Sequence, residues 1–125
     1  MRFELIDQLV EQAPDRLVAI KNVTVAEEYL ADHFPGFAVL PGVMMLEALV
    51  QAGRRLLANR AELLVLAQVK NLRYGNMVRP GQCLWVEVVL QGEQGNQFDL
   101  TGVGKVDDQV AVKGRFTLTP LALSL

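Results

Sequence analysis

Residues Gly42–Arg60, GVMMLEALVQAGRRLLANR, decide the fold, because they form the one long segment with the composition of a helix. Apolar side chains surround the axis in the first ten residues, so we expect this half to be buried on all sides. Pro41 precedes the segment, where its missing N–H costs little. The second half carries Arg54, Arg55 and Arg60, whose charges suit the negative end of a helix dipole. The sequence predicts one helix with a buried start and a cationic end.

Short segments with the composition of strands flank this helix. Phe3–Glu11 fits either a helical face or a strand, and Ala26–Ala31 predicts one or two helical turns. Turns are predicted at Ala13–Asp15, at Gly92, Gly95 and Asn96, and at Asp107-Asp108. Strands are predicted at Arg16–Val25, Leu63–Tyr74, Gln82–Gln91, Gln97–Val106 and Gln109–Thr119.

Two of these strands carry more specific expectations. Leu63–Tyr74 is apolar on both faces in its first half, which favours a central or an interface strand. Gln109–Thr119 alternates, which predicts an apolar face made of Val110, Val112, Phe116 and Leu118.

The order of elements predicts an α+β fold in which an antiparallel sheet of about six strands curls around the helix and buries it. A length of 125 residues predicts one domain spanning residues 1–125. One face of such a sheet grips the helix, and the other is solvated or paired with a second subunit.

Composition excludes several classes of function. Hydrophobic residues make up 51% of the chain and the net charge is −2, which argues against disorder and against a basic nucleic-acid surface. With one cysteine, Cys83, and one histidine, the chain has no internal disulfide and no Cys/His zinc site. Met1–Val10 lacks the apolar run of a signal peptide, and prolines and glycines interrupt Phe34–Ala52, so we expect no membrane span and a cytoplasmic protein.

Glu47 is the first candidate for chemistry, since it is the only ionisable side chain between Phe34 and Gly53. Burying a carboxylate costs several kcal/mol, of order 3–5, unless it is paired or hydrogen-bonded. Glu47 therefore either points to a solvated edge or subunit seam, or is kept because it acts. Gln51, one helical turn later, is placed to orient it.

His33 is the second candidate, in a segment stiffened by Pro35. A lone histidine is more often structural than catalytic. Together with Glu47, however, it would form an acid/base pair suited to proton transfer beside a carbonyl. The two can meet only through the fold or across a dimer.

The start of the predicted helix is the third element. Gly42 lets a ligand approach the backbone closely, and N–H groups at a helix N-terminus bind anions and developing oxyanions. A thioester carbonyl bound at Gly42 and Val43 would be polarised, although an ordinary helix start also uses Pro and Gly. Met44 and its neighbours are either core or the lining of an apolar tunnel for an acyl chain.

Three motifs at fixed spacing resemble the signature of a known enzyme family. His33-Phe34-Pro35-Gly36, Leu40-Pro41-Gly42-Val43 and Glu47-Ala48-Leu49-Val50-Gln51 are similar to the signature of the FabZ-type β-hydroxyacyl-acyl-carrier-protein dehydratases. Val18–Thr24 and Val78-Arg79-Pro80-Gly81 resemble flanking segments of the same family. The resemblance extends from about Phe3 to Leu118.

The resemblance implies a hotdog fold, and dehydration of a 3-hydroxyacyl thioester to a trans-2-enoyl thioester in fatty-acid or related synthesis, without metal or organic cofactor. It implies a homodimer with shared sites, often as a trimer of dimers, acting on substrates carried by acyl carrier protein. By position, His33 would be the base and Glu47 of the other subunit the acid. Gly42 or Val43 would hold the carbonyl, Gln51 would orient Glu47, and Phe37 and Met44 would complete the substrate-binding residues.

Departures from the family pattern affect the substrate rather than the acid/base pair. Ala38 stands in place of a proline, Val50 in place of an alanine and Gln82 in place of an aspartate. We also expect the N-terminal loop of the family to be shortened. Acyl chain length and access to the tunnel therefore stay open.

Two other functions compete with the dehydratase. A hotdog thioesterase would use a carboxylate and water on the same thioester, and a non-catalytic subunit would only bind the acyl carrier. The acidic carrier would need a basic patch, for which Arg54, Arg55, Arg73 and Arg79 are candidates, although a solvated face is the ordinary role of such residues.

Overall fold

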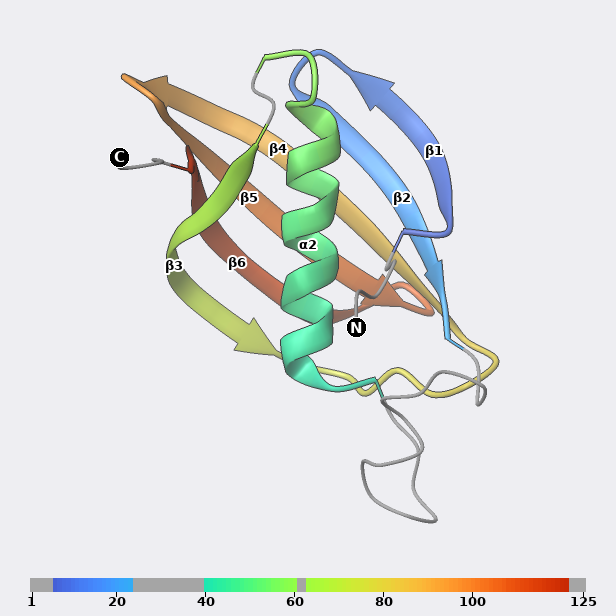
Figure 1. Cartoon of the computed structure of the whole chain (residues 1–125). Coiled ribbons are helices and arrows are strands. Elements are labelled where there is room, and N and C mark those ends of the chain that lie inside the picture. Colours follow the sequence, from blue (N-terminus) through green and yellow to red (C-terminus); the bar gives the residue numbers. More distant parts are fainter. Residues whose placement is uncertain (1–5, 24–39, 61–62, 122–125) are drawn as a thin grey trace.

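The computed structural model describes residues 6–23, 40–60 and 63–121. Its strands form one six-stranded sheet in the order β1-β2-β4-β5-β6-β3, and all neighbouring strands are antiparallel. In chain order the elements are β1 (Gln8–Ala13), β2 (Arg16–Asn22), α2 (Gly42–Leu56), β3 (Leu64–Tyr74), β4 (Cys83–Gln94), β5 (Gln97–Val106) and β6 (Gln109–Pro120) (Figure 1).

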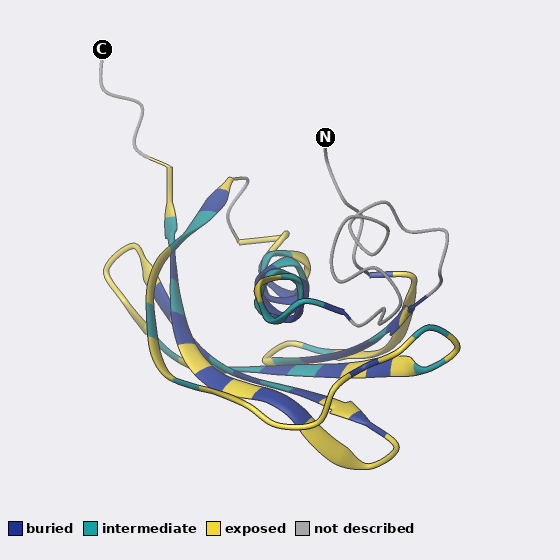
Figure 2. Cartoon of the chain, turned by 90° about the horizontal axis from the view of Figure 1, so that it is seen from below, coloured by how far each residue is buried: buried dark blue, intermediate teal, exposed yellow. Residues whose placement is uncertain are grey.

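The sheet curls around α2, which lies in its concave side (Figure 2). Alternation along the strands produces this arrangement, because every second side chain points to the same face. On β4, alternation along Gln82–Gln91 predicts an apolar row of Leu84, Val86, Val88 and Leu90; the first three are fully buried, and Leu90 is half-buried against the core. The predicted α+β sheet wrapped around one helix is therefore the observed architecture.

Two glycines let the helix lie close to the sheet. A methyl group added at Gly53 of α2 would lie 3.2 Å from side-chain atoms of Leu118 and Phe116. One added at Gly102 of β5 would lie 3.1 Å from Leu49 of α2 and from Phe116. Because ordinary contacts are longer, a side chain at either position would push the two layers apart.

The helix differs from its prediction in two respects. It ends at Leu56 rather than at Arg60, because Leu57 turns into the core and residues 57–60 form tighter turns. The expectation that its first half is buried on all sides is wrong for the single chain. The sheet covers one side only, so Val43 is 65% exposed and Glu47 is half-exposed.

β3 is an edge strand, which corrects the expectation of a central position. It pairs with β6 on one side, and this ladder is interrupted by two irregularities, between Leu66 and Gln68 and between Lys70 and Arg73. A strand at the edge of a sheet leaves backbone groups without a partner on its outer side. The alternative expectation, that β3 lies at an interface, stays a prediction.

β6 shows why strict alternation misplaces one residue. The register shifts so that Lys105 pairs with Val110 while Gly104 pairs with Val112, which leaves Ala111 as the extra residue. A bulge of this kind places successive residues on one face. Ala111 and Val112 are therefore both buried, and Val110, predicted to be on the apolar face, is 38% exposed.

The turn predictions have mixed outcomes. Asp107 and Asp108 form the tight turn between β5 and β6, both with positive φ (50° and 64°). Gly95 and Asn96 form the turn between β4 and β5 as expected, but Gly92 lies within β4. The ambiguous first segment is a strand from Gln8 onward. The predicted turns of Ala26–Ala31 lie outside the described residues.

Candidate active site

The N-terminus of α2 presents backbone amides at one end of the sheet. The Met44 and Met45 amides donate to the Pro41 carbonyl at 3.0 and 3.1 Å. Within the described residues, the amides of Gly42 and Val43 have no acceptor, as expected for the first positions of a helix. The arrangement can polarise a carbonyl oxygen placed at the helix end.

Tyr74, the last residue of β3, covers the first residue of the helix. A methyl group added at Gly42 would lie 2.9 Å from Cε1 and Cζ of the Tyr74 ring and 3.3 Å from its hydroxyl oxygen. The lack of a side chain at Gly42 thus makes room for this ring. Partial burial raises the pKa of the Tyr74 hydroxyl, since it disfavours the charged phenolate.

Glu47 lies on α2 and is paired with a residue of the same helix. Its Oε1 is 3.5 Å from Nη1 of Arg54, whose Nε donates a 2.8 Å hydrogen bond to the Leu64 carbonyl of β3. Both side chains are about 40% exposed, at 43% and 40%. The carboxylate is thus held at the open side of the helix and remains accessible.

His33 and Phe37, two of the predicted site residues, lie outside the described residues. The residues on either side of that segment are held by one neighbouring stretch of chain. The Val23 amide donates to the backbone carbonyl of Gln82 at 3.1 Å, and the Leu40 amide donates to the backbone carbonyl of Val78 at 2.8 Å. Val23 and Leu40, which flank segment 24–39 in the sequence, are therefore both held beside residues 78–82, and Leu40 directly precedes the residue that caps the helix.

The remaining predicted residues all lie on α2. Val43 is exposed, Met44 is half-buried against the core, and Gln51 is half-buried one turn after Glu47. The structure thus brings Gly42, Val43, Met44, Glu47 and Gln51 onto one helix. Their roles towards a substrate stay predictions.

Sequence reasoning missed two neighbours of the site. Arg54, considered only as a carrier contact, follows Glu47 by two helical turns, and that spacing on one helix face was the available signal. Tyr74 meets Gly42 only because β3 returns along the helix, so no local signal marked it.

Two negative findings concern only the described part of the chain. There, no helix is long and apolar enough to cross a membrane. No group of three His, Cys, Asp or Glu side chains in the same ranges gathers into a metal-ligand set.

Most of the chain is similar in sequence to known dehydratases. The family model described as ApeI dehydratase, of the ApeI-like group, matches residues 9–115. A curated 3-hydroxyacyl-[acyl-carrier-protein] dehydratase FabZ of Thermotoga petrophila is 36% identical over 117 residues, covering 93% of this chain and 85% of that protein. The FabZ of Caulobacter vibrioides is 36% identical over 121 residues, covering 91% of this chain and 76% of that protein.

Solved structures support the same architecture. A chain of the dehydratase heterocomplex ApeI:P from Xenorhabdus doucetiae superposes with a TM-score of 0.77 at 17% identity, covering 95% of this chain and 84% of that chain. At this identity the likeness concerns the fold, which is that of a hotdog protein. With the sequence matches, it follows that the chain belongs to the family of ApeI-like and FabZ-type dehydratases.

Proposed function

We propose that this protein removes water from 3-hydroxyacyl thioesters carried on acyl carrier protein and releases trans-2-enoyl thioesters, in fatty-acid or related acyl-chain synthesis. Family membership supports the reaction class, because the curated relatives are named for this activity. The observation that carries the proposal is the helix itself. The amides of Gly42 and Val43 and the carboxylate of Glu47 lie on one helix, with Glu47 on its open side.

The proposed chemistry balances with two side chains. His33 takes the C2 proton of the substrate, and the C–H electron pair becomes the C2=C3 double bond. The C3–O bond breaks, and the carboxyl group of Glu47 supplies the proton with which the hydroxyl leaves as water. The helix amides hold the thioester oxygen while charge develops on it. Gln51 orients Glu47, and Phe37 and Met44 line the acyl group.

A second copy of the chain completes the proposed site. The sheet leaves one side of α2 uncovered, and β3 is an edge strand next to it. A homodimer that covers these features would bring His33 of one chain to Glu47 of the other. Sedimentation would distinguish a dimer from a trimer of dimers. We propose a single cytoplasmic hotdog domain as the unit of this assembly.

Hydration of a crotonyl thioester, the reverse reaction, tests the proposal directly. We expect His33→Ala and Glu47→Gln each to lower its rate by about 10²-fold or more. Mixing the two variants should restore about one quarter of the wild-type activity, because a mixed dimer holds one intact site. Wild-type protein that hydrates no enoyl thioester, or variants that retain activity, would refute the assignment.

One observation favours the thioesterase as a second candidate. Arg54 lies beside Glu47, and a neighbouring cation suits an ionised carboxylate that activates water. Release of free thiol from an acyl thioester, without an enoyl product, would establish this function in place of the dehydratase.

A further inference from the structure

The outer face of the sheet, away from α2, carries a groove of about 770 Å³. Four exposed cations line it: Arg73 of β3, Lys105 of β5, and Lys113 and Arg115 of β6. Of the described residues that line this outer cationic groove, only Glu87 is acidic. This concentration of positive charge contrasts with the net charge of −2 of the whole chain.

Pairing between β3 and β6 places like charges opposite each other. Arg73 is the cross-strand partner of Lys113, and Lys70 is the partner of Arg115. Like charges directly opposite in an antiparallel pair destabilise the sheet. Neither these cross-strand residues nor Lys105 forms an ion pair with a carboxylate in the described part of the chain. Among the described residues, these two like-charged pairs are thus without a compensating carboxylate, and a bound anion would relieve their repulsion.

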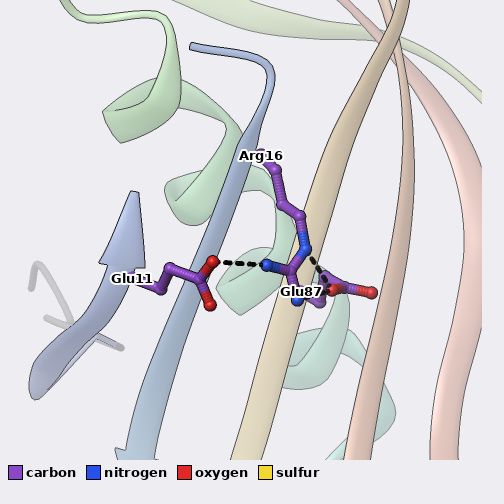
Figure 3. A network of polar contacts seen from close by, with 3 residues as sticks. All are labelled: Glu11, Arg16 and Glu87. Atoms are coloured by element: carbon purple, nitrogen blue, oxygen red, sulfur yellow. Dashed lines mark hydrogen bonds and ion pairs between the residues drawn. The ribbon is translucent and has the colours of Figure 1, made fainter. Parts of the chain in front are cut away.

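The one acidic residue of the groove is already engaged. Arg16 of β2 donates from Nε to Glu87 at 2.6 Å and from Nη1 to Glu11 at 2.8 Å (Figure 3). These hydrogen bonds, to Glu87 first and then to Glu11, raise the pKa of Arg16 above its ordinary value. Arg16, which is shared with Glu11, thus offsets only part of the Glu87 charge, but the four cations of the groove outnumber this single carboxylate.

The groove reaches the strand end that covers the active-site helix. Arg73 lines it, and the next residue, Tyr74, packs on Gly42 from the opposite face of β3. Their cross-strand partners on β6 also lie on opposite faces of the sheet. Lys113, opposite Arg73, is exposed, and Val112, opposite Tyr74, is fully buried. A partner bound in the groove is therefore separated from the amides at the N-terminus of α2 only by the C-terminal end of β3.

We propose that the outer cationic groove is the docking surface for the acidic face of the acyl carrier protein. This inference rests on the proposed function and adds to it the place where the carrier binds. Carboxylates of the carrier fill the positions between the like-charged pairs of β3 and β6. The acyl arm then passes around the end of β3, beside Tyr74, to the N-terminus of α2.

Kinetics with matched substrates test the docking. The double variant Lys113→Glu/Arg115→Glu is compared with wild type on 3-hydroxybutyryl carrier protein and on the N-acetylcysteamine thioester of the same acid. We expect kcat/KM to fall about tenfold to a hundredfold on the carrier, mainly through KM, because charge reversal replaces attraction by repulsion. The small thioester should react as before. Arg60→Glu, a charge reversal at a single position on the turn after α2, is the control and should leave both rates unchanged.

Four outcomes would overturn the proposal. Unchanged kinetics on the carrier would show that the groove is not used, and an equal loss on both substrates would show damage to the active site. An equal loss on the coenzyme A thioester and on the carrier would assign the groove to a nucleotide phosphate instead. A change in sedimentation of the double variant would assign it to a second copy of the chain.

A binding measurement separates this proposal from the catalytic one. Trp85, the single tryptophan of the chain, is 46% exposed and pairs with Lys105 at the groove. Titration with holo carrier protein should change its fluorescence in wild type and in Glu47→Gln, and not in the double variant. Binding of the carrier without turnover would refute the dehydratase function and support the docking surface. Turnover of the small thioester without binding of the carrier would support the dehydratase function and refute the docking surface.

Discussion

The two faces of the sheet are made by alternate residues of the same strands, yet they have opposite character. The inner face is apolar and grips α2, with Val88 of β4 as one of its fully buried members. The outer face holds the neighbouring Val89 and, further along, the cations of β3 and β6. A period of two residues thus lets one set of strands build a core on one side and a charged surface on the other.

Loss of the Glu47 carboxylate should have the largest effect on the inner side. Glu47→Gln should lower the rate of enoyl thioester hydration by about 10²- to 10⁴-fold, since it removes the proposed proton donor. Because the side chain is half-exposed, the midpoint of thermal unfolding should stay close to that of wild type. A residual rate near wild type would remove Glu47 from the mechanism.

Val88 and Val89 are a matched pair across the two faces. Val88→Ala should lower the free energy of unfolding by about 2 kcal/mol, through lost burial and the cavity left under α2. Val89→Ala, with the same atoms removed on the outer face, should cost less than about 1 kcal/mol. Urea unfolding of the two variants measures the difference. Equal losses would mean that the outer face is covered as tightly as the core.

Gly102 and Gly92 give a second matched pair. A methyl group at Gly102 meets Leu49 and Phe116 at 3.1 Å, so Gly102→Ala should destabilise the fold by about 1–2 kcal/mol. Gly92→Ala meets nothing within 4 Å and should be neutral or slightly stabilising. Thermal unfolding monitored by circular dichroism compares them. If both tolerate alanine equally, the helix is not held at the distance described.

Tyr74 should give the smallest effect, visible at alkaline pH. Its hydroxyl pKa is raised by partial burial, so the folded state favours the neutral phenol. The resulting contribution to stability is complete below the ordinary pKa of tyrosine and is lost as the pH rises through the raised value. In the Tyr29→Phe variant Tyr74 is the only tyrosine. Absorbance titration of this variant should show that Tyr74 ionises at a higher pH in the folded than in the unfolded protein. Coincident titrations would place the ring in solvent.

Much of the fold could be predicted because it depends on local patterns. Strand-like composition located β4 and β5, the consecutive aspartates located the turn at Asp107, and the apolar run located α2. The errors share a physical cause, namely long-range geometry. Val110 faces outward because a bulge at Ala111 shifts the register, and β3 is an edge strand because the strand order is set by the whole sheet.

The site was predictable to a similar degree. Residues that share α2 were found by helical spacing. Arg54, which pairs with Glu47, could have been found by the same spacing, because it lies two turns further on. Tyr74 could not, since its contact with Gly42 joins the end of β3 to the start of α2.

The hydrogen bonds of Val23 and Leu40 to residues 78–82 have an evolutionary consequence. They fix the entry and exit of segment 24–39 independently of what lies between. For loops in general, the entropic cost of closure rises by only about 0.6 kcal/mol when the length doubles. Insertions or deletions between these two anchors would therefore leave the scaffold nearly as stable as before. Descendants of this chain could explore new acyl groups by changing segment 24–39 alone, while the sheet and helix stay constant.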